Sequence, residues 1–475
     1  MHKWIAVVVP MAMAVAAPLS AAPAGRTLRL SAALSSARAD ETQPVWVFFR
    51  DKDGAAAPVA LTPRALARRQ ARGSLPLVDA ADAAVAPGYL AEVERIAHVR
   101  HASRWFNAAS VDATPAQVEA LGALPFVERL DLVRRFRRQP EPADAPAEGK
   151  LRASARKVAA IDYGLSLGQL EQIGVPTLHR AGYDGTGVMV AIFDAGFDNL
   201  AHEAFASTRI LAQYDFVNGD LDVANGSGRG EGSHGTNTLS VIGGYREGML
   251  VGPAYGASFL LGKTEDTSRE TPVEEDHWAA AAEWAEAAGA DVISSSLGYL
   301  DYDAGFRSLN PSELDGDTAI STRAADLAAE RGVVVVNSAG NQGFDRTHNT
   351  LGAPADGDGV IAVGAVDATG ARASFSSVGP SADGRIKPDV AAQGVAVVAA
   401  GSPSRTSYRL VNGTSFSCPL TAGVAALLVQ IHPTRTAAEI RDAMRASGSQ
   451  AGSPDNLLGY GIVNATLAAA SLSGR

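Results

Sequence analysis

The chain has 475 residues, of which 46% are hydrophobic and 19% charged, so it is too long for one ordinary domain and too apolar for a disordered chain. Its 48 Gly and 24 Pro follow no fixed period, which excludes a collagen-like fibre, and its single cysteine excludes a disulfide framework or a cysteine-rich zinc site. The net charge of −10 disfavours nucleic acid as a partner. This charge is uneven, because residues 23–150 carry 18 Lys and Arg against 15 Asp and Glu, whereas residues 151–475 carry 22 against 36.

The first 24 residues have the pattern of a secretory signal peptide. A positive start is followed by the apolar run Trp4–Ala17 and then by small residues around Ala21. This run of about 14 residues is too short to span a bilayer comfortably, so we predict export and cleavage rather than a membrane anchor. Residues 25–43 are small and polar, and we expect this lead to be disordered.

Residues 44–138 are predicted to form a small α+β domain. Strand-like runs lie at 45–49, 102–111 and 126–133. Helical segments begin at Thr62-Pro63, where proline suits the first helical position, at Tyr89 and at Thr114. Residues 139–165 begin with a stretch rich in Pro, Ala and charge, and we interpret them as a linker.

In residues 166–475, apolar strands alternate with Ala-rich helices. This alternation predicts an α/β fold with a mainly parallel sheet and helices on both faces. The strand candidates are 188–193, 258–261, 292–296, 333–338 and 360–366, and the helix candidates are 278–288, 319–331 and 421–431.

Four polar residues at the ends of these elements suit catalysis. Asp194 ends a buried strand, His234 stands at a helix start, Asn341 follows a strand of small residues, and Ser415 lies in a Gly-rich turn before a helix. Each alone has an ordinary explanation as a cap or a turn residue. Together they supply an orienting acid, a base, an oxyanion donor and a nucleophile, and Asp, His and Ser follow the chain order of the subtilisin triad.

The sequence resembles the subtilisin-like serine peptidases, or subtilases, over residues 180–470. Three departures from the family's pattern remove no catalytic group: Ala195 replaces a hydroxyl residue, Phe416-Ser-Cys418 follows the nucleophile, and Gln393 stands where the family often has Pro. The motifs that carry the resemblance are Asp194-Ala-Gly, Ser233-His-Gly-Thr236, Ser338-Ala-Gly-Asn341, Gly413-Thr-Ser415 with Pro419, Gly252-Pro-Ala-Tyr-Gly-Ala257, Ser296-Leu-Gly298, Lys387-Pro-Asp389 and Gly459-Tyr-Gly461.

The resemblance implies an endopeptidase that cleaves protein or peptide substrates through an acyl-enzyme. Asp194 would orient His234, His234 would act as base, Ser415 as nucleophile, and Asn341 as oxyanion donor. No cofactor is required for this chemistry. The resemblance also implies two substrate-clamping strands, one at Ser296, Leu297 and Gly298 and one near Gly262, and a wall of the S1 pocket at Ser338, Ala339 and Gly340.

Structural calcium is frequent in this family, but the sequence assigns no metal site. Asp215, Asp220 and Asp222 lie close together in the sequence, and so do Asp315 and Asp317. Neither group supplies a complete set of oxygen ligands that can be identified from spacing.

The N-terminal domain resembles the inhibitor prodomain of subtilases at Arg104–Ala108, Thr114–Leu121 and Pro125–Arg129. This implies a ferredoxin-like β-α-β-β-α-β domain that assists folding and inserts its C-terminal tail into the catalytic cleft. Residues 139–165 would then hold the processing site. Residues 265–286 contain eight acids, which form either a solvated face or an acidic rim beside the subsites with internal partners among Arg134, Arg135, Arg137 and Arg138.

We therefore predict a monomeric, autoprocessed serine endopeptidase that is secreted or periplasmic and leaves the membrane after signal cleavage. The alternative is a catalytically silent binding scaffold with the same fold. A nucleotide-using α/β enzyme is disfavoured, because no Gly-x-Gly-x-x-Gly motif opens a helix after a strand. We expect no further anchoring or sorting domain after about residue 470.

Overall fold

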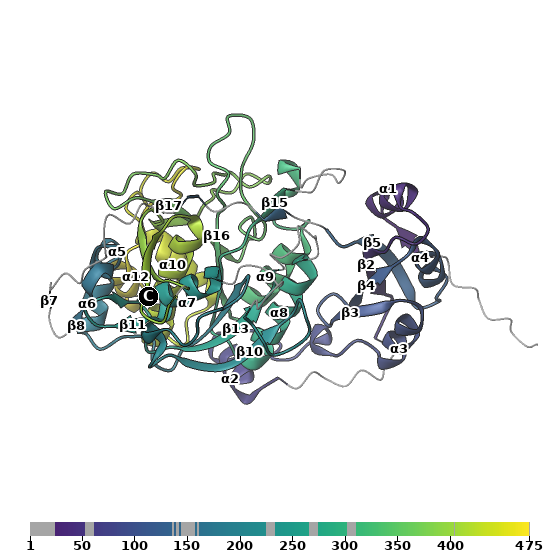
Figure 1. Cartoon of the computed structure of the whole chain (residues 1–475), viewed down its shortest axis with the longest axis horizontal. Coiled ribbons are helices and arrows are strands. Elements are labelled where there is room, and N and C mark those ends of the chain that lie inside the picture. The colour runs from purple at the N-terminus through teal and green to yellow at the C-terminus, as the bar shows by residue number, and fades with distance from the viewer. Residues whose placement is uncertain are drawn as a thin grey trace, which may run out of the picture.

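A computed structural model shows two domains that pack against each other (Figure 1). The expected signal peptide, except Ala24, and most of the expected linker lie outside the described residues. The structure describes residues 24–52, 61–134, 137–138, 142–143, 157–158, 161–224, 233–265, 274–301, 310–402 and 404–474.

The N-terminal domain is a five-stranded sheet in the order β1-β5-β2-β4-β3. All neighbouring pairs are antiparallel except β1 with β5. The succession β2-α3-β3-β4-α4-β5 confirms the expected ferredoxin-like arrangement. The elements are β1 (Gly25–Arg26), α1 (Leu28–Ser36), β2 (Gln43–Phe49), α2 (Pro63–Ala71), α3 (Pro87–Ile96), β3 (His98–Ser103), β4 (Ala108–Ala113), α4 (Pro115–Gly122) and β5 (Val127–Leu132).

Two features of this domain differ from the sequence-based expectation. The lead 25–43, expected to be disordered, forms β1 and α1, because Leu30 is fully buried in the domain core and Thr27 caps the helix. The single strand expected at 102–111 is a hairpin of β3 and β4. A turn separates the strands, in which Ser103 Oγ accepts a hydrogen bond from Phe106 N and Asn107 adopts a φ of 48°.

The C-terminal domain contains a seven-stranded sheet in which all neighbouring strands are parallel, in the order β10-β13-β9-β14-β16-β17-β18. This confirms the predicted fold class and the five strand candidates, while β10 and β18 were not predicted. The strands are β9 (Met189–Asp194), β10 (Arg209–Asp215), β13 (Ser258–Lys263), β14 (Val292–Ser295), β16 (Val334–Ser338), β17 (Val360–Val366) and β18 (Val390–Gln393).

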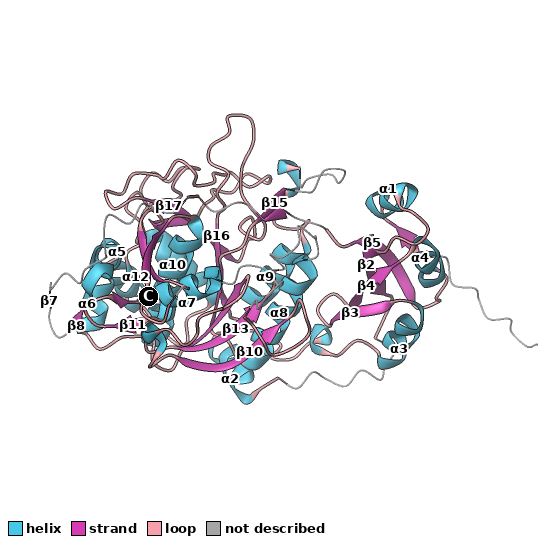
Figure 2. Cartoon of the chain, in the orientation of Figure 1, coloured by secondary structure: helices cyan, strands magenta, loops and turns pink. Residues whose placement is uncertain are grey.

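Helices cover both faces of this sheet (Figure 2). Successive residues of a strand point to opposite faces, so Val190 and Ile192 join the cluster that includes α7 and α10, whereas Ala191 and Phe193 join the cluster that includes α8 and α9. The helices are α5 (Leu167–Gln172), α6 (Val175–Arg180), α7 (Ser233–Gly243), α8 (Glu274–Ala288), α9 (Ile320–Glu330), α10 (Thr414–Ile431), α11 (Ala437–Ala446) and α12 (Ala465–Ser473).

Helix α10 is the core helix of the C-terminal domain. It has the length and hydropathy of a membrane span, alone among the helices of the described residues, but 89% of it is buried inside the fold. The sequence predicted only its second half, from Thr421. The helix begins earlier, at Thr414, so Pro419 lies within it.

The C-terminal domain also begins earlier than expected. Tyr163, assigned to the linker from the sequence, is 1% exposed, packs in the main core and makes a 2.9 Å hydrogen bond to His179 Nδ1. Four two-stranded pairs complete the fold: β6 (Arg137–Arg138) with β15 (Tyr299–Asp301), β7 (Lys157–Val158) with β8 (Ile161–Asp162), β11 (Tyr245–Arg246) with β12 (Leu250–Val251), and β19 (Val397–Ala400) with β20 (Tyr408–Val411).

The N-terminal domain packs on α8 and α9 through one face of its sheet. In β2, Val45 and Val47 face the domain's own core, whereas Trp46 and Phe48 join the α8–α9 cluster of the other domain. Helix α2 lies apart from its own sheet and packs against the C-terminal domain near the end of α8 (Figure 1). The two domains therefore share an interface with both apolar and polar contacts.

Candidate active site

The predicted catalytic residues lie at the carboxyl ends of parallel strands and at the starts of two helices. Asp194 is the last residue of β9, and Asn341 follows β16. His234 and Ser415 are the second residues of α7 and α10. Ligand sites of open α/β sheets lie at this edge, and the start of a helix offers backbone N–H donors that have no partner within the helix.

Asp194 and His234 are joined by a hydrogen bond. His234 Nδ1 lies 2.7 Å from Asp194 Oδ1, and the two residues are 5% and 0% exposed. Asp194 Oδ1 also accepts a hydrogen bond from Ala195 N at 2.7 Å, and Thr238 Oγ1 donates to Asp194 Oδ2 at 2.8 Å. Sequence reasoning missed Thr238, although its position four residues after His234 puts both side chains on one face of α7.

Ser415 lies at a turn that requires glycine. Gly413, the N-cap of α10, has a φ of 147°, which side chains rarely allow. Ser415 is 2% exposed and its Oγ donates to Ser296 O at 3.2 Å, while Ser296 Oγ donates to Ser415 O at 2.7 Å. The next residue, Phe416, packs on His234 with ring centroids 5.5 Å apart, so the base and the nucleophile segment are neighbours.

The carboxamide of Asn341 is oriented by Thr414, the residue before the nucleophile. Asn341 Oδ1 accepts hydrogen bonds from Thr414 N at 3.0 Å and from Thr414 Oγ1 at 2.9 Å. With the oxygen end held in this way, the donor end of the amide has a defined direction. Thr414 is a second positioning residue that the sequence analysis did not single out.

Six of the seven predicted substrate-binding residues lie together. Leu297 O accepts hydrogen bonds from Asn337 Nδ2 at 2.9 Å and from Ser338 Oγ at 3.3 Å, which ties the segment 296–298 to the segment 338–340. All three residues of the second segment, Ser338, Ala339 and Gly340, are buried and small.

Gly262 was predicted wrongly as part of a substrate clamp. It lies inside β13, where it is paired with Phe193 of β9 on one side and with Tyr214 of β10 on the other. Both edges of the strand are occupied at this position, so its backbone cannot pair with a substrate. Residues 266–273, which follow this strand, lie outside the described residues.

Cys418 is a core residue behind the nucleophile. It is fully buried, its Sγ lies 3.4 Å from Ser295 O, and burial raises the pKa of its thiol to about 12. The thiol therefore stays protonated and inert.

Two of the acids considered for calcium, Asp215 and Asp315, already have partners within the protein. Asp215 is fully buried, and its carboxylate accepts hydrogen bonds from Val217 N and Asn218 N and a 3.0 Å ion pair from Lys263 Nζ. Asp315 accepts hydrogen bonds from the backbone N–H groups of residues 317 and 318 and from Thr318 Oγ1. These carboxylates are used by turns and by a lysine rather than directed at a cation.

Four of the eight acids between residues 265 and 286 lie on α8 and are buried at the interface with the N-terminal domain. Glu275, Asp276 and Glu286 are fully buried and Glu283 is 6% exposed, so the interpretation as a solvated face is wrong for these four. Of the expected arginines, Arg134 interacts electrostatically with Glu275 and also pairs with Glu313. The other three acids bind arginines that were not expected: Glu286 binds Arg68, Arg69 and Arg104, Glu283 binds Arg104, and Asp276 binds Arg100.

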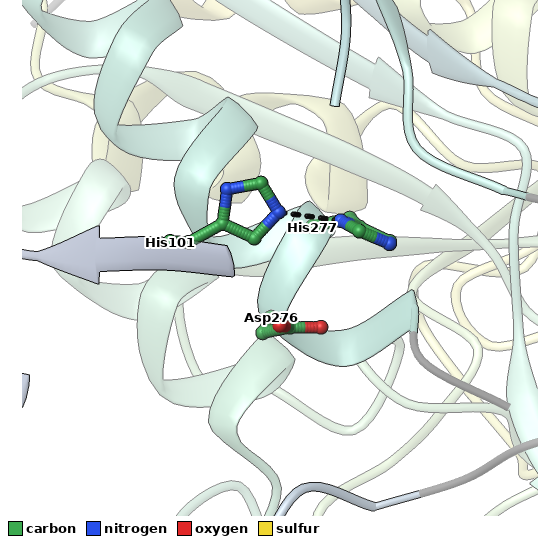
Figure 3. Close-up of side chains that lie close together, drawn as sticks. All are labelled: His101, Asp276 and His277. Atoms are coloured by element: carbon green, nitrogen blue, oxygen red, sulfur yellow. Dashed lines mark hydrogen bonds between the residues drawn. The ribbon is translucent and has the colours of Figure 1, made fainter. Parts of the chain in front are cut away.

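A histidine pair spans the same interface (Figure 3). His101 Nε2 of β3 lies 2.6 Å from His277 Nδ1 of α8, and Asp276 is adjacent. These three residues could approach one metal ion, but Arg100 lies 3.1 Å from His277 Nε2 and 3.4 Å from Asp276. Because this guanidinium already supplies the positive charge and needs His277 Nε2 as an acceptor, the cluster does not fit a metal cation.

Family models match both domains. A model of the subtilase family, peptidase S8, matches residues 185–461, and a model of the peptidase S8 propeptide domain of Bacteroidota matches residues 44–147. The first match alone covers more than half of the chain and contains all four predicted catalytic residues.

Individual proteins agree with these matches. The chain is 34% identical over 313 residues to subtilisin NAT of Bacillus subtilis subsp. natto, which covers 65% of this chain and 71% of that protein. It is 29% identical over 360 residues to an alkaline protease of Alkalihalobacillus alcalophilus, covering 76% and 78% of the two chains.

A solved structure shares the fold. Fervidolysin from Fervidobacterium pennivorans, described as a keratinolytic enzyme related to subtilisin, has a TM-score of 0.65 and 22% sequence identity to this chain. The likeness covers 95% of this chain and 63% of fervidolysin, so this chain spans less than two thirds of that protein. The family matches and the shared fold lead to one conclusion: this chain belongs to the subtilase family of serine peptidases and carries an N-terminal S8 propeptide domain.

Proposed function

We propose that this chain is an exported serine endopeptidase, made as a precursor that processes itself. The observation that carries the proposal is the buried Asp194–His234 hydrogen bond beside a nucleophile segment in which Ser415 starts a helix and Thr414 orients Asn341. The N-terminal domain is called the prodomain and the C-terminal domain the catalytic domain from here on.

In the proposed reaction, neutral His234 accepts the proton of the Ser415 hydroxyl as Ser415 Oγ attacks the carbonyl carbon of the scissile bond. Asp194 Oδ1 accepts the hydrogen bond from His234 Nδ1 and stabilises the imidazolium. Asn341 Nδ2 and the Ser415 backbone N–H stabilise the tetrahedral oxyanion. His234 then protonates the leaving amine, and water releases the acyl group by the reverse sequence of proton transfers.

Substrates are expected to be extended peptide segments that pair with the backbone of residues 296–298. Ser338, Ala339 and Gly340 leave room for a sizeable P1 side chain, and Gln342 places no charge at the rim, which supports a broad or apolar P1 preference. The chain's own groups supply the nucleophile, the base and the oxyanion donors, so we propose that the chemistry needs no cofactor. We also propose that the mature enzyme acts as a monomer.

The prodomain is the proposed intramolecular inhibitor and folding aid. Its last described strand, β6, pairs antiparallel with β15, which closely follows Gly298. Export is supported by the signal-like pattern of residues 1–24. The same pattern supports a secreted or periplasmic location without choosing between the two.

The test is to express the full chain beside the Ser415→Ala variant in a protease-deficient host. The wild type should yield a mature chain that lacks the basic prodomain and reacts with a fluorophosphonate probe. The variant should accumulate as the precursor and stay unlabelled. Labelling of the Ser415→Ala variant, or identical processing of both proteins, would refute the proposal in favour of a different nucleophile or a silent scaffold.

A further inference from the structure

Thr238 holds the free end of the catalytic carboxylate. Its hydroxyl donates to Asp194 Oδ2 at 2.8 Å, while His234 Nδ1 and Ala195 N both bond to Oδ1. We propose that Thr238 is the positioning residue of the catalytic dyad and takes over the task of a hydroxyl that Ala195 lacks. This inference rests on the proposed roles of Asp194 and His234.

The hydroxyl of Thr238 has two acceptors within reach but only one hydrogen to donate. Gly235 O lies 3.2 Å away, which is the usual bond of a helical threonine to the preceding turn, and Asp194 Oδ2 lies 2.8 Å away. The carboxylate is the nearer and the charged acceptor, so the hydrogen belongs to it. Thr238 is fully buried, so water does not compete for this hydrogen bond.

The hydrogen bond restricts the rotation of the Asp194 carboxylate. With two donors on Oδ1 alone, the carboxylate of Asp194 could turn about its Cβ–Cγ bond and still keep one of them. A donor on Oδ2, among the described residues supplied by Thr238, removes this freedom. His234 and Thr238 lie on the same helix, so α7 fixes the position of the Asp194 carboxylate relative to the His234 imidazole.

Position 195 is where a replacement hydroxyl can be introduced. Ala195 N already lies 2.7 Å from the carboxylate, so a side chain at this position starts beside Asp194. In the subtilase motif that residue 195 matches, a serine or threonine follows the Asp. In this chain Thr238 therefore supplies the hydroxyl that alanine at position 195 lacks.

The experiment compares Thr238→Val with Thr238→Ser, and with Ala195→Ser introduced into the Thr238→Val background, all in the full chain. Rates are measured on a peptide p-nitroanilide and normalised to active sites titrated with a fluorophosphonate. Thr421→Val is the matched control, because Thr421 is a buried helical threonine whose hydroxyl bonds to Ser417 O at 2.9 Å.

Thr238→Val should lose about 10- to 100-fold in kcat with KM changed less than about twofold, since a hydrogen bond to a charged group is lost but no substrate contact. Thr238→Ser and Thr421→Val should stay near the wild type, and Ala195→Ser should restore about tenfold or more to Thr238→Val. If Thr238→Val folds too poorly to assay, Thr238→Ala takes its place, alone and combined with Ala195→Ser, and the same loss and repair of kcat are expected.

An unchanged kcat in Thr238→Val, or a loss that Ala195→Ser does not repair while the melting temperature falls equally in Thr421→Val, would overturn the inference. These outcomes leave the proposed function standing, because it fails on different results: labelling of the Ser415→Ala variant, or identical processing of that variant and the wild type.

Discussion

Arg68 of the prodomain and Glu286 of the catalytic domain form an ion pair whose side chains are 2% and 0% exposed. The same guanidinium donates to Glu286 O at 3.2 Å and Ala290 O at 2.7 Å, at the C-terminal end of α8, and to Arg331 O at 3.3 Å, at the end of α9. The last carbonyls of a helix have no partner within it, and cations are favourable there. The side chain of Arg68 thus donates hydrogen bonds to carbonyls at the C-terminal ends of two helices of the catalytic domain.

Replacing Arg68 with methionine should therefore weaken the complex of the cleaved prodomain with the mature enzyme. Loss of one partner leaves Glu286 buried with fewer countercharges, at a cost of about 3 kcal/mol, or about 150-fold in the inhibition constant. Arg69 and Arg104 still contact Glu286, which keeps the expected loss at the low end for a broken buried pair.

Arg95→Met is the matched control for charge, because Arg95 is 71% exposed and pairs with Glu92 within its own helix. This variant should change the inhibition constant less than about threefold. Equal effects of the two substitutions would show that general charge, rather than the buried pair, binds the prodomain.

The affinity of the prodomain should also depend on pH through His101 and His277. Burial lowers the pKa of His101, and it lowers the pKa of His277 well below its usual value. A histidine whose pKa is lowered in the complex is neutral there, whereas in the free proteins it becomes protonated below its ordinary pKa of about 6.5. The complex is therefore weakened as the pH falls below that value, and the inhibition constant rises by up to about tenfold per pH unit for each histidine.

Two carboxyls at the interface act in the opposite direction. Burial raises the pKa of Glu275 to about 7 and also raises the pKa of Glu283, so protonation of these groups favours the complex as the pH falls. The histidine contribution is therefore isolated by comparing the pH profile of the inhibition constant for wild-type and His101→Gln prodomains between pH 8 and 5.5.

The wild-type inhibition constant should rise with acidification more than that of His101→Gln, by up to about tenfold at pH 5.5. His98→Gln is the control, since His98 lies on the same strand with its side chain 73% exposed, and this variant should follow the wild type. Added Zn²⁺ should leave all three profiles unchanged. Parallel profiles for wild type and His101→Gln would contradict the prediction.

The processing bond is predicted to lie between residues 138 and 143. Arg138 pairs with Tyr299 of β15 on one side of the site, and Asn412, three residues before the nucleophile, donates its Nδ2 to Ala143 O at 2.6 Å. N-terminal sequencing and intact mass of the mature chain should place its first residue within 139–143, a narrower interval than the linker 139–165. A first residue outside 139–143 would show that the chain is cleaved elsewhere.

Asn341→Asp should distinguish the role of the Nδ2 donor of Asn341 from that of its Oδ1 acceptor. The aspartate keeps an oxygen to accept from Thr414, which contacts Asn341 Oδ1 at 3.0 and 2.9 Å, but it removes the amide donor. Loss of one oxyanion donor costs about 10²–10³ in kcat, so a drop of at least this size with little change in KM is expected from steady-state kinetics. Gln342→Ala, at the next residue, should stay within about threefold of the wild type.

The central strands and the catalytic residues could be predicted because both leave strong local signals. Apolar runs such as Val334–Ser338 are typical of strands that are buried on both faces, and the motifs around Asp194 and Ser415 combine glycine turns with polar groups. Strand β10 was missed because four of its residues are polar or charged and only Asp215 is buried, as suits an edge strand.

Other errors arose where long-range contacts decide the structure. Gly262 looks like a free strand end in the sequence, and only the pairing with Phe193 and Tyr214 shows that both its edges are used. The acids of α8 have the composition of a solvated surface, and their burial depends on arginines about 180 to 220 residues away in the chain. The helix α1 likewise depends on a core that residues 25–43 alone cannot supply.

The hydrogen bonds from α2 and its flanking residues to carbonyls of the catalytic domain affect how the enzyme folds. Thr62 and Ser74 join Arg68 in bonding to carbonyls at the ends of α8 and α9, at residues 287, 288 and 330, so these helix ends are completed by groups that the proposed processing would remove. Once the prodomain has left, a mature chain that unfolds must re-form these helix ends with water in place of the lost donors. If the proposed processing occurs, the mature chain is therefore expected to refold less readily than the precursor.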